Sequence, residues 1–274
     1  MSMVAGRWLD PDGGKEVAHR DMMARMSHMQ AVLLGETHDR YDIHRWQLHV
    51  TTGLFALRDR MAVAFEMFPR AVQPALDRWV AGEIDLDAFL DQSRWAEVWR
   101  FDPALYTPIF HFCRQFRVPM LAVNCRRALV TEVGKSGWDA IPVDERDGVT
   151  PAVPATPEHR QYLFDLTGGR RPDRAAQSAQ APEFDRFVRA QQTWDRAFAC
   201  GIADSLKADP ERLVVGIIGR GHLEFGHGTP HQLRDLGVRD VGILLPHDVG
   251  QGAPDAEIAA GIADGVFALD DASR

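Results

Sequence analysis

Residues 31–44 read AVLLGETHDRYDIH, an apolar run followed at once by ionisable side chains. Ala31–Leu34 is predicted to be a strand buried on both faces, because it is wholly apolar and shows no polar alternation. Glu36 and His38 follow it two residues apart, and in extended backbone such residues point to the same side. We therefore expect them to share one site. The alternative is that the pair only caps the strand end and holds the loop by hydrogen bonds.

Four further apolar runs have the character of buried strands: Met61–Phe65, Val118–Val123, Leu213–Ile218 and Val241–Leu245. Helical patterns lie between them, over residues 44–57, 70–81, 102–116 and 183–207. Asp102 followed by Pro103 is a typical N-cap and first-turn pair. Strands that alternate with helices predict an α/β fold, with a central, mostly parallel sheet flanked by helices.

The segment 139–182 breaks this alternation with six prolines. It is predicted to be a helical, Pro-rich excursion off the sheet, with 168–182 as a mobile loop. Residues 1–274 are otherwise expected to form a single α/β domain.

Composition excludes several classes of protein. The formal net charge of −8 argues against a nucleic-acid partner, which requires a basic face. Three widely spaced cysteines form no zinc pair and no disulfide framework. No run approaches the roughly 18 apolar residues of a membrane span, and the start lacks a signal-peptide pattern or a lipid-anchor cysteine. We expect a soluble protein, either cytoplasmic or a periplasmic form without its leader.

Polar residues follow every candidate strand. These segments are Gly35–His38, Glu66–Arg70, Asn124–Arg127, Gly219–His222 and Pro246–Asp248. In open α/β sheets ligands bind beyond the carboxyl ends of the strands. We therefore expect Glu36, His38, Glu66 and His222 to line one pocket.

Each of these residues also has a purely structural interpretation. Glu66, expensive to bury alone, could pair with Arg70 or Arg126. His222 could be an ordinary loop histidine, and Asn124 and Arg126 could only brace the loops. His44, on the first predicted helix, could face the site or belong to the core.

The cluster suggests two kinds of chemistry. In a hydrolase, His38 would act as general base and Glu36 or Glu66 would orient it. Alternatively, Glu36, His38 and His222 would hold a divalent metal ion that generates hydroxide. The catalytic candidates are therefore Glu36, His38, Glu66 and His222.

Several segments together resemble the ChaN-like haem-binding family of the Tiki superfamily. They are LLGETHDRYDIHRWQ, VAFEMFPRAVQPALDRWVAGEID, WAEVWRFDPALYTPIFHFCRQFRVPMLAVNCRR, QQTWDRAFACGIADSL and VVGIIGRGHLEFGHGTPHQL, and the resemblance spans about residues 28–246. It implies a sheet flanked by helices, haem as cofactor and a role in iron acquisition. Related branches, esterase-like hydrolases and metal-dependent proteases, imply site residues that match Glu36, His38, Glu66 and the motif Gly219–His222.

The chain departs from this family in one respect. Members often carry tyrosines after the second GxxH motif, whereas Phe225 and His227 stand here. Because histidine can ligate haem iron, His227 is the first candidate axial ligand and Tyr41 the next. His44, Asn124 and Arg126 complete the candidate haem contacts. The expected partner is haem or another small molecule, and a homodimer is also considered.

Haem binding without chemistry is the first hypothesis and a hydrolase the second. Haem requires an apolar slot with one or two axial ligands, and a hydrolase requires a polar cleft.

Overall fold

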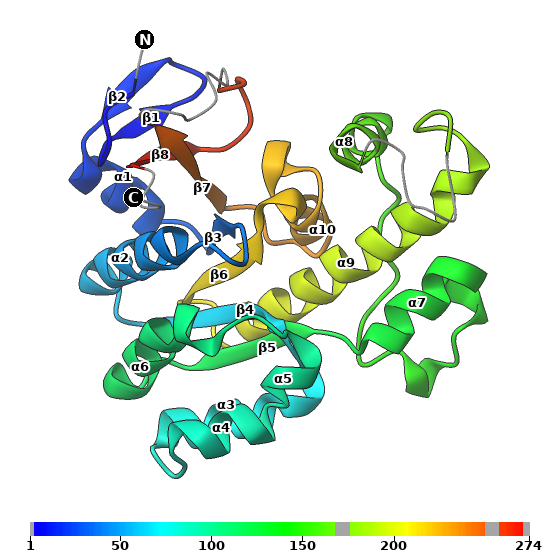
Figure 1. The fold of residues 1–274 in the computed structure, drawn as a ribbon, viewed down its shortest axis with the longest axis horizontal. Coiled ribbons are helices and arrows are strands. Elements are labelled where there is room, and N and C mark those ends of the chain that lie inside the picture. Colours follow the sequence, from blue (N-terminus) through cyan, green and yellow to red (C-terminus); the bar gives the residue numbers. More distant parts are fainter. Residues whose placement is uncertain (1–2, 168–175, 250–257, 271–274) are drawn as a thin grey trace.

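The computed structural model describes residues 3–167, 176–249 and 258–270. Its centre is an eight-stranded sheet with the strand order β2-β1-β8-β7-β3-β6-β4-β5 (Figure 1). All neighbouring pairs from β8 to β5 are parallel, whereas β1 is antiparallel to β2 and β8. The predicted α/β class, with a mostly parallel sheet, is therefore confirmed.

All five predicted strands are present. They are β3 (Ala31–Glu36), β4 (Met61–Pro69), β5 (Met120–Asn124), β6 (Leu213–Gly219) and β7 (Val241–Val249). Every residue of β3 and β6 is buried, as expected for inner parallel strands. The sequence did not indicate β1 (Trp8–Asp10), β2 (Lys15–Val17) or β8 (Gly265–Asp270). β1 and β2 have only three residues each, and β2 is half-exposed or exposed throughout.

The predicted helices are also confirmed, as α2 (Tyr41–Leu57), α3 (Gln73–Ala81), α6 (Thr107–Phe116) and α9 (Asp185–Ala208). Asp102 accepts a hydrogen bond from the backbone of Ala104 and so caps the short turn before α6. Gly82 ends α3 in the left-handed conformation, at φ 75°. The remaining helices are α1 (His19–Ser27), α4 (Leu86–Gln92), α5 (Trp95–Val98), α7 (Arg127–Ser136), α8 (Pro157–Thr167) and α10 (Thr229–Asp235).

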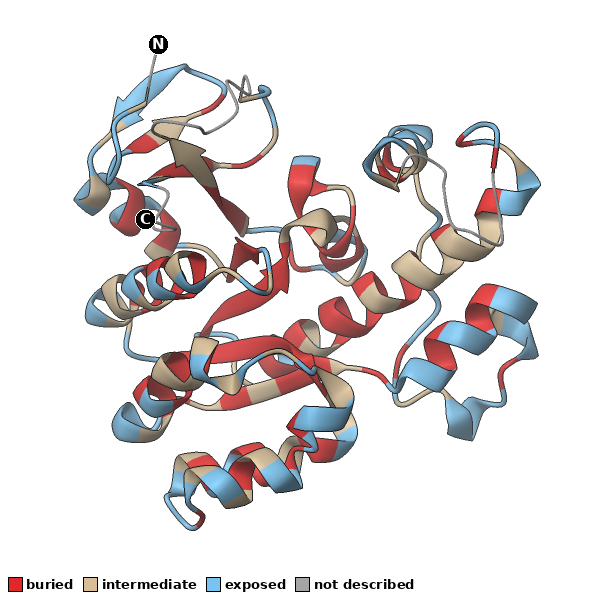
Figure 2. Cartoon of the chain, viewed as in Figure 1, coloured by how far each residue is buried: buried red, intermediate tan, exposed pale blue. Residues whose placement is uncertain are grey.

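Helices cover both faces of the sheet, and the buried residues concentrate along the strands and on the helix sides that face them (Figure 2). On one face α1, α2, α3 and α6 enclose a large core that includes Trp46, Trp79 and Phe110. On the other face α9 and α10 pack Phe198, Ile202 and Leu233 against the strands. None of the described helices combines the length and apolarity needed to cross a bilayer.

The Pro-rich excursion contains two short 3-10 turns, Trp138–Ala140 and Val143–Glu145, and then α8. Of the predicted mobile loop 168–182, residues 168–175 lie outside the described residues. Its mobility therefore stays a prediction, as does the treatment of the whole chain as one domain.

An irregularity in β4 places one of the candidate site residues. Phe65 pairs with Ala122 and Pro69 with Asn124, so four steps along β4 match only two along β5. Glu66 is the first residue beyond the regular ladder. Bulges of this kind occur beside functional sites because they re-aim a side chain.

Phe110 of α6 lies at the centre of the aromatic core. It is fully buried, and its ring lies 5.4–5.7 Å from the rings of Phe65, Phe68, Phe89 and Trp95. We expect Phe110→Ala to lower the free energy of unfolding by about 3–5 kcal/mol in urea titrations followed by circular dichroism. Phe116→Ala, on the same helix but half exposed, should cost about 1 kcal/mol or less. Equal losses would contradict this description of the core.

Candidate functional site

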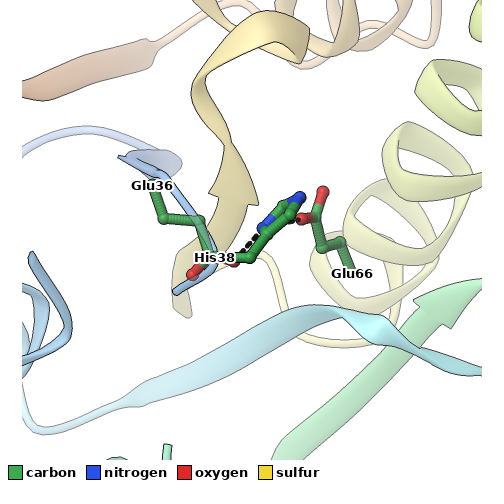
Figure 3. A group of neighbouring side chains, drawn as sticks. All are labelled: Glu36, His38 and Glu66. Atoms are coloured by element: carbon green, nitrogen blue, oxygen red, sulfur yellow. Dashed lines mark hydrogen bonds and ion pairs between the residues drawn. The ribbon is translucent and has the colours of Figure 1, made fainter. Parts of the chain in front are cut away.

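Glu36, His38, Glu66 and His222 all lie at the carboxyl ends of parallel strands. Glu36 is the last residue of β3, and His38 stands in the turn before α2. Glu66 lies at the irregularity of β4, and His222 belongs to a 3-10 turn that follows β6. Figure 3 shows the imidazole of His38 between the carboxylates of Glu36 and Glu66.

The first pair of this site is Glu36 with His38. Nδ1 of His38 lies 2.7 Å from Oε1 of Glu36, whose side chain is fully buried. The same oxygen accepts the hydroxyl of Tyr106 at 2.9 Å, and the amide of Gln47 lies 3.4 Å from the other oxygen. Because Oε1 of Glu36 is an acceptor, which also receives the Tyr106 hydroxyl, His38 donates Nδ1–H to it and its Nε2 is turned away from Glu36. The arrangement is that of an oriented base or a metal ligand.

Electrostatics keep the His38 ring basic. Burial lowers its pKa, but the hydrogen bond to Glu36 and the charges of Glu66, Glu36 and Asp39 outweigh burial. The net result is a pKa raised above the usual value of histidine.

His222 forms a second pair of the same kind, with Asp195 of α9. Nδ1 of His222 lies 2.8 Å from Oδ1 of Asp195, which is almost fully buried and also accepts the hydroxyl of Thr229 at 3.1 Å. Burial lowers the pKa of His222, yet the charge and hydrogen bond of Asp195 raise it overall.

Asp195 was not among the residues that the sequence indicated. A signal was nevertheless present, because Asp195 interrupts the buried stripe of α9 that contains Val188, Phe198 and Ile202. A carboxylate on such a stripe is costly unless it has a partner.

Glu66 lies between the two pairs and is the least satisfied group of the site. It is 3% exposed, and its Oε1 accepts no hydrogen bond from any described residue. Nδ1 of His38 is 3.5 Å from this oxygen. Burial and the charge of Glu36 raise the pKa of Glu66 to about 7, against the opposing charges of His38 and His222.

Glu66 pairs with neither Arg70 nor Arg126, the two structural partners that the sequence suggested. Arg70 pairs with Asp204 at 3.1 Å, and Arg126 pairs with Asp147 at 3.2 Å. Glu66 is therefore held by the site itself.

Gly219, at the end of β6, leaves room for the side chains of His38 and Glu66. A Cβ atom there would lie 3.1 Å from Cε1 of His38 and 3.3 Å from Oε1 of Glu66. Both contacts are tighter than ordinary van der Waals distances, so a larger residue would push the ring and the carboxylate apart.

A pocket of about 790 Å³ opens above this group and is lined by His38, Glu66 and His222. We call it the strand-end pocket. Trp99 meets the His38 ring edge-on at 4.7 Å, and Trp194 meets the His222 ring at 6.4 Å. Three of the four residues predicted to share a pocket therefore line it, whereas Glu36 lies behind His38.

Two other candidates, His44 and Asn124, have their polar atoms engaged in holding the loops. His44 is buried, with Nδ1 3.0 Å from Oε1 of Gln47 and Nε2 3.1 Å from the carbonyl oxygen of His38. Asn124 lines the pocket, but its amide donates to the carbonyl of Glu66 and accepts from the backbone of Cys125. Both ring nitrogens of His44 and both amide atoms of Asn124 are therefore engaged.

Arg126 and Tyr41, candidate haem contacts, lie apart from each other. Arg126 lines the strand-end pocket while it pairs with Asp147. Tyr41 is exposed at the start of α2, and the guanidinium of Arg45 lies 4.2 Å above its ring.

His227 lies on a second, more open surface, which we call the His227 face. It is a depression of about 530 Å³ lined by Pro157, Glu158, Gln161, Tyr162, Asp165, Phe225 and His227. The ring of His159 stacks on that of His227 at 5.6 Å. Burial and the nearby positive groups His231 and Arg234 lower the pKa of His227, against the opposing charge of Glu158. The imidazole is therefore neutral at neutral pH, the form that binds metal.

The neighbouring aromatic residues shape this face. The hydroxyl of Tyr162 donates to Oε2 of Glu224 at 2.8 Å, and burial together with the charge of Glu224 raises the pKa of the phenol. Tyr162 therefore stays protonated. Phe225 is 36% exposed and adopts φ 59°, a conformation that is unfavourable for a bulky side chain and is often found at functional sites.

Residues 22–233 match the family described as haem-binding uptake, Tiki superfamily, ChaN, and the chain belongs to this family. No curated protein sequence matches it. Among solved structures it is similar to ChaN of Campylobacter jejuni, reported with cofacial haem binding. The TM-score is 0.70 at 21% identity, over 95% of each chain.

More distant similarities reach two other proteins. The erythromycin esterase EreC, as its H289N mutant in an open conformation, gives a TM-score of 0.51 at 10% identity over 87% of this chain and 77% of that one. The type III effector HopBA1 gives 0.50 at 13% over 91% and 92%. At these identities the likeness shows a common fold only.

The buried carboxyl of Glu66 predicts a pH dependence of stability. Because its folded-state pKa lies above its unfolded value, the folded state holds the extra proton between about pH 4.5 and about pH 7. This contribution to stability is therefore lost as the pH rises through that window. Relative to Glu66→Gln, the wild type should lose on the order of 2–3 kcal/mol of unfolding free energy from about pH 4.5 to about pH 8.

The comparison requires urea unfolding of both proteins in chelator across this range. A difference between them that stays constant with pH would contradict the raised pKa of Glu66.

Proposed function

We propose that this protein binds haem on the His227 face, with His227 as an axial ligand of the iron. The family to which the chain belongs supports haem as the ligand. The observation that carries the location is a neutral, half-buried imidazole on an open face with aromatic residues. Histidine is an established axial ligand of haem iron.

The other residues of this face suit a porphyrin. The rings of Tyr162 and Phe225 lie 6.0 and 5.7 Å from that of His227, and Phe225 is 36% exposed. Aromatic rings beside an imidazole offer a flat apolar ligand a surface to pack on. Since Tyr162 keeps its proton, it supports the porphyrin by packing and not as a tyrosinate ligand.

The openness of the His227 face also suggests how two haems could meet. A porphyrin that lies on it would leave its other side uncovered, and the solved ChaN structure is reported with cofacial haem. We propose that two copies of this chain meet across the His227 face with their haems stacked. The description of the family as haem-binding uptake supports a role in iron acquisition.

We expect His227→Ala to weaken haemin binding on the order of 10-fold or more and to shift the Soret band, because the axial bond is lost. His28→Ala removes an exposed histidine at the end of α1 and should change neither. Haemin titration followed by absorbance measures both variants.

Sedimentation velocity should show that haemin converts the monomer into a dimer. An unchanged Soret band and affinity in His227→Ala would remove His227 as the ligand. It would leave haem binding supported by the family alone.

A second function is favoured by the two carboxylate–histidine pairs. We propose that the strand-end pocket holds a divalent metal ion for hydrolysis of a small substrate. Ligand atoms of Glu36, His38 and Glu66 lie within 4.8 Å of one another. Oε1 of Glu36 is already bound by Nδ1 of His38, so we propose Glu66 and Nε2 of His38 as ligands, with His222, which lines the same pocket, as the third.

The residues present fit such an ion. Two imidazoles and one carboxylate are a common ligand set for divalent metals, and Glu36 and Asp195 would orient the rings from behind. Oε1 of Glu66 accepts no hydrogen bond from the described residues and is therefore available to coordinate an ion. A bound ion would lower the pKa of a coordinated water and so supply a nucleophile.

Zinc titration against a chromogenic chelator tests this second function. Wild type should bind one ion, and Glu66→Gln, His222→Ala and Asp195→Asn should each weaken binding on the order of 10-fold or more. His28→Ala is again the control. In an ester assay with zinc present, His38→Ala should lower turnover on the order of 10-fold or more, because the ion loses a ligand.

The haem affinity of His38→Ala should stay at the wild-type value, because the proposed haem ligand lies elsewhere. Absence of stoichiometric metal binding and of turnover in wild type would eliminate the second function.

A further inference from the structure

The rim of the strand-end pocket is rich in arginine. Arg94, Arg100, Arg126 and Arg127 all line it, against one exposed acidic residue, Glu97. The chain as a whole carries a net charge of −8. The positive charge at this rim is therefore local and opposite in sign to that of the protein, which favours an anionic ligand.

The side chains of two of these arginines are unpaired among the residues that the structure describes. Arg94 pairs with Glu97, and Arg126 pairs with Asp147. Over residues 3–167, 176–249 and 258–270, the side chains of Arg100 and Arg127 form no hydrogen bond or ion pair. A guanidinium presents a planar fork of donors that matches a carboxylate.

The backbone around α5 adds an independent observation. Arg94 and Arg100 stand at either end of this helix with φ values of 56° and 72°. Such values are natural for glycine and unfavourable for residues with a Cβ atom. The chain nevertheless places arginines there, on the pocket rim, and strained positions of this kind concentrate at functional sites.

The interior of the pocket completes the pattern. Trp99 and Trp194 stand beside the two histidines and line the pocket. The buried Oε1 of Glu66 lies at its floor and accepts no hydrogen bond from the described part of the chain. The pocket therefore combines a cationic rim, aromatic walls and a polar floor. Its volume of about 790 Å³ is within the usual range for small-molecule sites.

We propose that the strand-end pocket binds a small organic carboxylate with a flat, apolar body. Its carboxylate lies at the rim that Arg100 and Arg127 form, and its body lies between the two tryptophans. This inference names the substrate class of the second proposed function and rests on that pocket being functional. Binding of the carboxylate itself requires neither metal nor haem.

Calorimetric titration in chelator with 1-naphthoate, and with its neutral analogue 1-naphthamide, tests the proposal. Wild type should bind the carboxylate more tightly than the amide. The double variant Arg100→Gln/Arg127→Gln should lose about 10-fold or more in affinity for naphthoate, because charge-assisted hydrogen bonds disappear. Arg20→Gln/Arg239→Gln removes two exposed arginines elsewhere and should leave the affinity unchanged.

A second measurement uses the unaltered protein. Naphthoate should protect Arg100 and Arg127 from modification by phenylglyoxal, as read by peptide mass spectrometry, whereas Arg239 should react equally with and without it. This result does not depend on how well the double variant folds.

Haem carries carboxylates too, so haemin titration of the double variant distinguishes a small carboxylate from haem as the ligand of the two arginines. Haemin affinity should equal that of wild type, since the proposed haem site is the His227 face. The proposal is overturned if naphthoate binds the double variant as it binds wild type, or does not bind wild type at millimolar concentration. It is also overturned if the double variant loses haemin and not naphthoate. If wild type binds naphthoate but no zinc, the proposed metal site is wrong and the proposed carboxylate site stands.

Discussion

The hydrogen bond between Glu36 and His38 is the interaction on which the rest of the site depends. It joins a fully buried carboxylate at the end of β3 to a ring that reaches the strand-end pocket, at 2.7 Å. A buried carboxylate without partners would be strongly unfavourable. Here Gln47 of α2 and Tyr106, the residue before α6, also donate to it, so both segments are tied to the end of β3. The same contacts fix which nitrogen of His38 remains free, and therefore what this site can bind.

The sequence predicts the inner strands well because each is an apolar run without alternation, which few structures other than a buried parallel strand explain. It also predicts that polar groups gather at their ends, because parallel strands share one edge. It does not reveal Asp195, whose partner His222 is 27 positions away and comes near only when α9 packs on β6. The displacement of Glu36 behind His38 likewise follows from tertiary packing. β1 and β2 are too short to produce a pattern.

One stretch of chain after β6 serves two different surfaces. His222 faces the strand-end pocket through its bond to Asp195, and His227, five positions later, lies on the more open face beside α8. Glu224 stands between them and fixes Tyr162. A single fold can therefore combine a haem face with a polar pocket, and similarity in fold to an esterase and an effector decides neither function. The function resides in these side chains.

The central claim is that haem lies on the His227 face and the strand-end pocket has a different ligand. A crystal structure of the haemin-loaded protein tests it most directly. The account predicts iron bonded to the imidazole of His227, with the porphyrin against Phe225 and Tyr162 and no porphyrin between Trp99 and Trp194. Porphyrin inside the strand-end pocket, with iron bonded to His38 or His222, would contradict it.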